Sequence, residues 1–122
     1  MRTFLLVTAA VLSMSATAFA QPVGTFAVEG RNPGASGGPP AYTGTITITP
    51  AGDSFDVVWT FGNTRVQGRG LFVNNVFSVA YPNRRPAGPA VAAYVLMPNG
   101  MWAGRWVIPG NPNSGTEILI RR

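Results

Sequence analysis

The stretch AYTGTITIT, residues 41–49, alternates two kinds of side chain with a period of two. Tyr42, Gly44, Ile46 and Ile48 fall on one face of an extended chain, and four threonines fall on the other. This period is typical of a β-strand with one buried face and one face in water. Isoleucine and threonine are β-branched and favour strands. The stretch therefore predicts a strand whose apolar face joins a core.

Seven further segments have a similar strand-like composition. They are residues 24–30, 54–61, 64–72, 76–81, 90–97, 101–108 and 115–121. Short turns separate most of them, at residues 50–53, Gly62-Asn63, Asn74-Asn75 and Asn99-Gly100, and the last pair is typical of a type I′ turn. Because short turns make consecutive strands antiparallel neighbours, we predict an all-β fold, a small eight-stranded antiparallel up-and-down barrel. The alternative is a β-sandwich.

Glycine and proline are concentrated in three stretches between the predicted strands. The chain has 15 Gly and 11 Pro, and many of them lie in residues 31–41, 82–89 and 109–115. We expect these three stretches to be loops. The segments between them are rich in β-branched and aromatic residues, which favours an ordered domain over a disordered chain.

The first twenty residues are predicted to be a signal peptide. A positive start at Met1-Arg2 precedes an apolar run over residues 4–14, and Ala18-Phe19-Ala20 fits a signal-peptidase site. The apolar run is too short to span a bilayer, which takes about 20 residues. We expect cleavage after Ala20, a periplasmic or secreted location, and a single β-barrel domain over residues 21–122. No segment of that domain is apolar over a length that would cross a membrane as a helix.

The composition disfavours an enzyme. The chain contains no histidine, cysteine or lysine, which excludes a Ser–His–acid triad, a thiol nucleophile, a Schiff-base lysine and a His or Cys metal site. Its four acids are Glu29, Asp53, Asp56 and Glu117. Only Glu117, which shares a face with Leu119, is expected to point inward, and an ordinary salt bridge with an arginine is the favoured interpretation. We predict no catalytic residue, cofactor or metal.

The chain is basic, with nine arginines, four acids and a net charge of +5. A basic surface favours acidic partners, although the spread of the arginines also fits general solubility. Arg84 and Arg85 cluster in YPNRRPAGP (81–89), which makes that predicted loop the best exposed recognition candidate, because arginine binds carboxylate or phosphate bidentately. A solvated loop is the alternative. Nucleic acid is not an expected partner of an exported chain whose aromatic residues point inward.

Six large aromatic residues form the candidate binding set. They are Tyr42, Trp59, Tyr81, Tyr94, Trp102 and Trp106. In MWAGRW (101–106), Trp102 and Trp106 are predicted to face inward across Gly104, while Arg105 faces outward. The gap at Gly104 would hold either a neighbouring strand's side chain or a ligand. We favour a structural role for the set, because an eight-stranded barrel is barely wide enough for its own side chains. A void above about 300 Å³ would favour a ligand site instead.

Several segments together resemble a known group of proteins. They are VEGRNPG, YTGTITI, GDSFDVVW, GRGLFVNNVFSVAY, VAAYVLMPNGMWAGRW and GTEILIR. Their order is similar to that of small secreted bacterial β-proteins, often labelled fibronectin-binding or uncharacterised exported proteins. The strand number also resembles avidin-like and lipocalin-like barrels, as a fold analogy.

The resemblance and the missing catalytic residue types together predict an exported, non-enzymatic binding protein. Its partner would be an extracellular or envelope macromolecule, bound through loops and outer-face arginines. One alternative is a carrier of a small apolar ligand in an aromatic-lined barrel interior. The other alternative is a secreted enzyme inhibitor.

Overall fold

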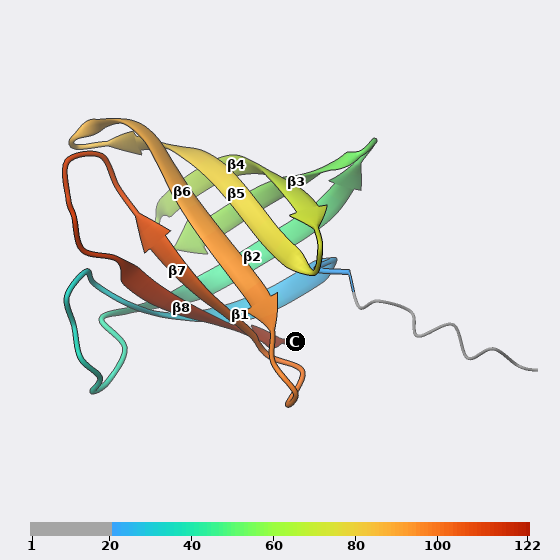
Figure 1. Ribbon diagram of the computed structural model, residues 1–122, viewed down its shortest axis with the longest axis horizontal. Helices are drawn as coiled ribbons and strands as arrows, with labels where there is room; N and C mark the ends of the chain where they lie inside the picture. The colour runs from blue at the N-terminus through green and yellow to red at the C-terminus, as the bar shows by residue number, and fades with distance from the viewer. Residues whose placement is uncertain (1–20) are drawn as a thin grey trace, which may run out of the picture.

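The protein is a closed barrel of eight antiparallel strands (Figure 1). The computed structural model describes residues 21–122, so the predicted signal peptide lies outside the described residues. Each strand pairs with the next along the chain, and β8 pairs with β1 to close the sheet. The prediction of an all-β up-and-down barrel is therefore confirmed. The part of the chain that the structure describes has no helix able to cross a membrane.

The strands follow the predicted order with small shifts at their ends. Their bounds are β1 (Gly24–Arg31), β2 (Tyr42–Ala51), β3 (Ser54–Phe61), β4 (Thr64–Val73), β5 (Val76–Arg84), β6 (Ala87–Leu96), β7 (Trp102–Val107) and β8 (Gly115–Arg121). The predicted faces are also confirmed. In β2, Ile46 and Ile48 are buried. In β4, Arg65 and Arg69 are exposed, and Gly70 on the opposite face is buried.

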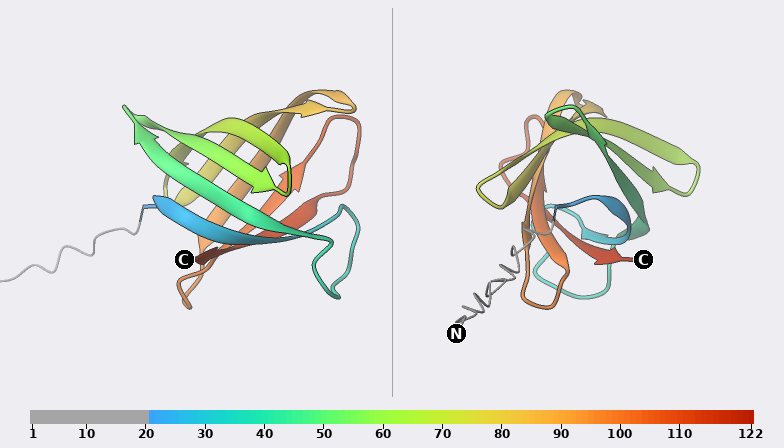
Figure 2. Two further views of the ribbon diagram at one scale, coloured as in Figure 1. Left: turned by 180° about the vertical axis from the view of Figure 1, so that it is seen from behind. Right: turned by 90° about the vertical axis from the view of Figure 1, so that its right-hand side faces the viewer.

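The two ends of the barrel differ. The β1–β2 loop, the β5–β6 tip and the β7–β8 loop gather at one end, which we call the open end (Figure 1). The start of β1, the C-terminus and the β6–β7 turn lie at the other, which we call the closed end (Figure 2). Apolar side chains fill the closed end, because inward residues from all sides meet there. Those with almost no exposure include Phe26, Ile48, Val57, Phe77, Trp102 and Leu119.

The predicted loop at residues 82–89 is wrong, because most of it is strand. β5 continues to Arg84 and β6 starts at Ala87, with Pro82 opposite Pro89. Neither β4 nor β7 pairs with these residues, because the β4–β5 pairing stops at Arg69–Ala80 and the β6–β7 pairing stops at Val91–Val107, so they form a two-stranded ribbon. A proline at such an edge removes no ladder hydrogen bond, since no strand lies beyond it. The concentration of proline predicts a loop here, but the edge position of Pro82 and Pro89 makes both compatible with a strand.

The turn between β6 and β7 also differs from the prediction. A type I′ turn needs positive φ at both central residues, and Asn99 does not have it. Instead, Gly100 donates its N–H to the Met97 carbonyl at 2.9 Å and has a φ of 85°. Pro98 and Asn99 are therefore the central pair, and proline suits the first of these places. Within residues 21–122, Asn74 and Asn75 are the non-glycine residues with positive φ, as their turn requires.

Candidate functional site

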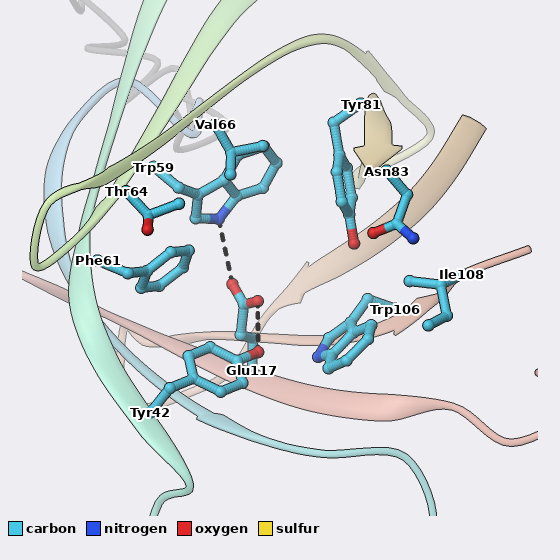
Figure 3. Close-up of a pocket in the computed structure, with 10 residues that line it drawn as sticks. All are labelled: Tyr42, Trp59, Phe61, Thr64, Val66, Tyr81, Asn83, Trp106, Ile108 and Glu117. Atoms are coloured by element: carbon cyan, nitrogen blue, oxygen red, sulfur yellow. Dashed lines mark hydrogen bonds between the residues drawn. The ribbon is translucent and has the colours of Figure 1, made fainter. Parts of the chain in front are cut away.

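A buried carboxylate lies near the middle of the barrel. Glu117 on β8 is only 6% exposed and is the one charged residue in the buried core of residues 21–122. Its Oε1 accepts hydrogen bonds from Trp59 Nε1 at 3.2 Å and from the Tyr94 hydroxyl at 2.9 Å. Its Oε2 accepts one from the Tyr42 hydroxyl at 2.7 Å. We call these four residues the carboxylate network; Figure 3 shows the bonds from Trp59 and Tyr42.

The network partly agrees with the sequence prediction for Glu117. The inward orientation is confirmed. The expected salt bridge with an arginine is wrong, because the ion pair found among residues 21–122 joins Arg69 to Asp56 on the outer face. Neutral donors from three other strands take the place of an arginine. Such donors satisfy the oxygens of a buried carboxylate without bringing a second charge into the interior.

Two glycines allow the tyrosines to reach the carboxylate. Gly30 on β1 and Gly104 on β7 lie directly opposite Glu117 in its two neighbouring strands. A Cβ on Gly30 would lie 1.9 Å from the Tyr42 ring, and a Cβ on Gly104 would lie 2.2 Å from the Tyr94 ring. Each ring therefore occupies the space that a side chain would otherwise take. Of the two alternatives for the gap at Gly104, the neighbouring strand's side chain is confirmed.

The surroundings of Glu117 affect its proton affinity in two opposing ways. Burial favours the neutral acid and raises its pKa, whereas the donors Tyr42, Tyr94 and Trp59 favour the carboxylate and lower it. The burial effect is larger, so the pKa of Glu117 is raised above its usual 4.5. Burial, with the adjacent carboxylate, likewise raises the pKa of the Tyr42 and Tyr94 hydroxyls, and it raises that of Tyr81 to about 12. These hydroxyls stay neutral donors at physiological pH.

A pocket of about 320 Å³ lies above this network at the open end. Figure 3 shows its lining residues, with Glu117 at the centre and aromatic rings around it. The residues that line the pocket are Tyr42, Trp59, Phe61, Thr64, Val66, Tyr81, Asn83, Trp106, Ile108 and Glu117. Half of them are aromatic, and Glu117 is the only acidic or basic residue type among them. We call this the open-end pocket.

The aromatic side chains support one another around the pocket. The rings of Trp59 and Tyr81 have centroids 5.1 Å apart, and Tyr42 packs edge-on against Phe61 at 5.3 Å. Tyr42 also meets Trp106 at 6.3 Å. Ring pairs at these separations are mutually stabilising. The walls are therefore held in place without a ligand, which reduces the entropy lost when one binds.

Trp106 has a buried polar atom without a partner. Its Nε1 is inaccessible to water and makes no hydrogen bond with the described residues. The nitrogen faces the Tyr42 hydroxyl and Glu117 across the pocket (Figure 3). Gly115 on β8 lies opposite Trp106, and a Cβ there would lie 2.2 Å from the indole. A buried donor that lacks a partner is rare. Because neighbouring side chains cover this nitrogen, a ligand atom can reach it only when one of them moves.

The six aromatic residues predicted as a set do not stay together. Tyr42, Trp59, Tyr81 and Trp106 line the open-end pocket. Tyr94 and Trp102 are each 1% exposed and belong to the core, Tyr94 beneath the pocket floor and Trp102 at the closed end. The six residues therefore do not form one site: four line the pocket and two belong to the core.

Several lining residues were absent from the predicted site. They are Phe61, Thr64, Val66, Asn83, Ile108 and Glu117. The alternation of the strands could have found half of them, because Phe61, Asn83 and Ile108 each lie two residues from a predicted member of the site. Phe61 follows Trp59 in this way, and Ile108 follows Trp106. What the alternation does not reveal is which inward residues lie at the same end.

The predicted arginine pair lies outside the pocket. Arg84 and Arg85 are exposed at the tip of the β5–β6 ribbon, and neither makes a side-chain hydrogen bond or ion pair with residues 21–122. Other arginines bind their own chain. Arg31 donates to the Gly38 carbonyl, and Arg105 donates to Ser114 Oγ.

Comparison with known proteins assigns no family to the chain. No family model matches it, and no curated protein matches it. The resemblance to small secreted bacterial β-proteins therefore stays a prediction.

Proposed function

We propose that this barrel is a non-enzymatic binding protein that holds a small, mostly apolar, planar ligand in the open-end pocket. The observation that carries the proposal is the pocket itself. Ligand sites typically measure about 300–1,000 Å³ and combine apolar walls with a few polar groups. The open-end pocket, at about 320 Å³, is at the lower end of that range and has five aromatic rings in its lining.

The polar atoms of the pocket support the same proposal. Trp106 Nε1 offers a donor with no partner among residues 21–122, and Tyr81 and Asn83 bring further polar groups to the rim. The buried, unpaired state of the indole N–H costs about 1–3 kcal/mol, and a ligand acceptor would satisfy it if the ligand's entry displaces the side chains that cover the nitrogen. The flat aromatic walls favour a planar ring system.

A binding role fits the chemistry of the lining better than catalysis does. The single carboxylate already accepts three hydrogen bonds, and the chain has no histidine, cysteine or lysine to act with it. We also propose that the protein is exported, so that it binds its ligand in the periplasm or outside the cell.

The proposal is tested by titrating the purified protein with 1-naphthalenemethanol and measuring the binding by calorimetry and by tryptophan fluorescence. This neutral bicyclic probe has one hydroxyl that can accept from Trp106 Nε1. We expect saturable binding that weakens about threefold to tenfold in Trp106→Phe, which removes that donor. The matched control is Trp102→Phe at the closed end, whose affinity should stay within about twofold of the original. Absence of binding, or an equal loss in both variants, would contradict the proposal.

A second candidate function rests on a different surface. Arg84 and Arg85 stand at the tip of a projecting ribbon without partners in the described residues, which suits recognition of an acidic macromolecule. We therefore also propose, as the alternative, that the ribbon engages an extracellular or envelope polymer or an enzyme to be inhibited. Retention of the protein on immobilised extracellular-matrix proteins at physiological salt, lost in an Arg84→Ala, Arg85→Ala double variant, would support this function. Equal retention of the double variant would contradict it.

A further inference from the structure

Glu117 brings an acidic side chain into the open-end pocket, and none of the described residues that line the pocket is basic. The groups that face Glu117 from the other strands are the hydroxyls of Tyr42, Tyr81 and Tyr94 and the indoles of Trp59 and Trp106. All are neutral at physiological pH. The protein as a whole is basic, yet its interior carries an uncompensated carboxylate.

The hydrogen bonds to Glu117 leave room for one more donor. A carboxylate offers about four acceptor sites over its two oxygens. Oε1 accepts two hydrogen bonds, whereas Oε2 accepts only the one from Tyr42. The hydrogen bonds from Tyr42, Trp59 and Tyr94 each favour the carboxylate over the neutral acid, against the opposing effect of burial. A ligand entering the pocket can therefore add a donor at Oε2.

The walls of the pocket attract positive charge as well. Trp59, Tyr81 and Trp106 present aromatic rings around the space above Glu117 (Figure 3). The face of an aromatic ring is negative, and a cation within about 6 Å of its centroid is attracted, more strongly when it has lost its water. The carboxylate at the floor of the pocket and the aromatic rings in its walls therefore both favour a cationic group.

We infer that the ligand of the open-end pocket carries a cationic nitrogen on an aromatic or planar body, with the nitrogen donating to Glu117 and the body lying between the aromatic walls. This inference rests on the proposed small-ligand function. It narrows the ligand from apolar compounds in general to organic amines and amidines.

Three probes with the same naphthalene ring test the inference. 1-Naphthylmethylamine is cationic, 1-naphthalenemethanol is neutral, and 1-naphthoic acid is anionic at pH 7.5. The affinity of each is measured by calorimetry with the purified protein. We expect the amine to bind at least about tenfold more tightly than the alcohol, because a charge-assisted hydrogen bond is stronger than a neutral one. The acid should bind most weakly, because it would bring a second negative charge to Glu117.

Glu117→Gln removes the charge and keeps the shape. In this variant we expect the amine and the alcohol to bind within about threefold of each other. The matched control is Glu29→Gln, the same change on the outer side of β1, which should keep the full preference for the amine. A measurement that needs no variant repeats the comparison at pH 4. Glu117 is then protonated, since its pKa is raised above 4.5, while the amine stays charged, so the preference should shrink.

The outcomes separate the inference from the proposed function. A preference for the amine that disappears in Glu117→Gln and at pH 4 supports both. Equal binding of the amine and the alcohol, or tightest binding of the acid, overturns the cationic ligand and leaves the small-ligand function standing. Failure of all three probes to bind overturns both.

Discussion

Trp102 and Trp106 lie four residues apart on the same face of the same strand, yet their surroundings are opposite. Trp102 is 1% exposed at the closed end, where its ring packs against Phe72 with centroids 6.0 Å apart. Trp106 is half-buried at the open end and lines a pocket, with an Nε1 that has no partner in the described residues. One end of the barrel is therefore built as a core and the other as a site. The carboxylate network of Glu117, Tyr42, Trp59 and Tyr94 separates them.

The largest expected effect is at the closed end. Trp102→Ala should lower the free energy of unfolding by about 3–5 kcal/mol, because it leaves a cavity among side chains that have no freedom to fill it. Urea unfolding followed by circular dichroism measures this loss. A loss no greater than that of Trp106→Ala would break the comparison between the two ends.

The boundary between the ends should be sensitive to added volume. Gly104→Ala places a methyl group 2.2 Å from the Tyr94 ring, so the ring must move and its hydroxyl must leave Glu117. Overpacking of this kind costs about 1–3 kcal/mol, which thermal or urea unfolding can resolve. Ser78→Ala, on the exposed face of β5, is the control and should change stability by less than about 0.5 kcal/mol. Similar stabilities for the two variants would show that the ring contact is unimportant.

The buried carboxylate should make stability depend on pH. The folded protein holds the Glu117 proton at a pH where the unfolded chain has lost it, because folding raises the pKa above 4.5. Its contribution to stability is therefore complete below pH 4.5 and falls as the pH rises through the raised value. A single group can contribute a slope of at most about 1.4 kcal/mol per pH unit.

Glu117→Gln isolates this contribution. Unfolding free energies measured from pH 4 upward should show that the variant lacks the downward slope of the original protein. Asp53→Asn, a change in the exposed β2–β3 turn, should keep it. If the slope persists in Glu117→Gln, another group is responsible and the network does not titrate on unfolding.

The smallest expected effect on stability is at the open end. Trp106→Phe should change the free energy of unfolding by about 1 kcal/mol or less, because it trims a half-buried ring beside an existing void and removes an unpaired donor. Its effect should appear in ligand affinity instead. Urea unfolding of Trp106→Phe beside Trp102→Phe measures the difference, and a larger loss for Trp106→Phe would reverse the assignment of the two ends.

Much of the fold could be predicted from alternation and turns. The residues of β2 indicate their faces directly, because Thr alternates with Gly or Ile throughout TGTITIT. The alternation in β3 is less regular, since Val58 is apolar between Val57 and Trp59. The residues around 82–89 were harder. A proline is compatible with a strand only where no neighbouring strand needs its N–H as a donor. That depends on where β4 stops pairing with β5 and where β7 stops pairing with β6. Such information is not local to the segment.

The site was predicted less completely, for a related reason. Alternation places Tyr42, Trp59 and Trp106 inside, but it does not order inward residues along the barrel axis. Glu117 meets its donors through register. Gly30 and Gly104 come opposite it only when β1, β7 and β8 are aligned. The useful signal would have been that each glycine lies opposite a tyrosine, Gly30 opposite Tyr42 and Gly104 opposite Tyr94. These pairs are visible only when the register of the strands is known.

The carboxylate network joins β2, β3, β6 and β8, which include strands on opposite sides of the barrel, and so acts as a cross-brace. Its evolutionary consequence is modularity. Residues on the far side of the brace from the core, such as Thr64 and Ile108, line the ligand space and are not part of the core cluster. Substitutions there should combine additively with those in the core, since distant sites without shared partners rarely interact. A barrel braced in this way can change what it binds while its folding stays the same.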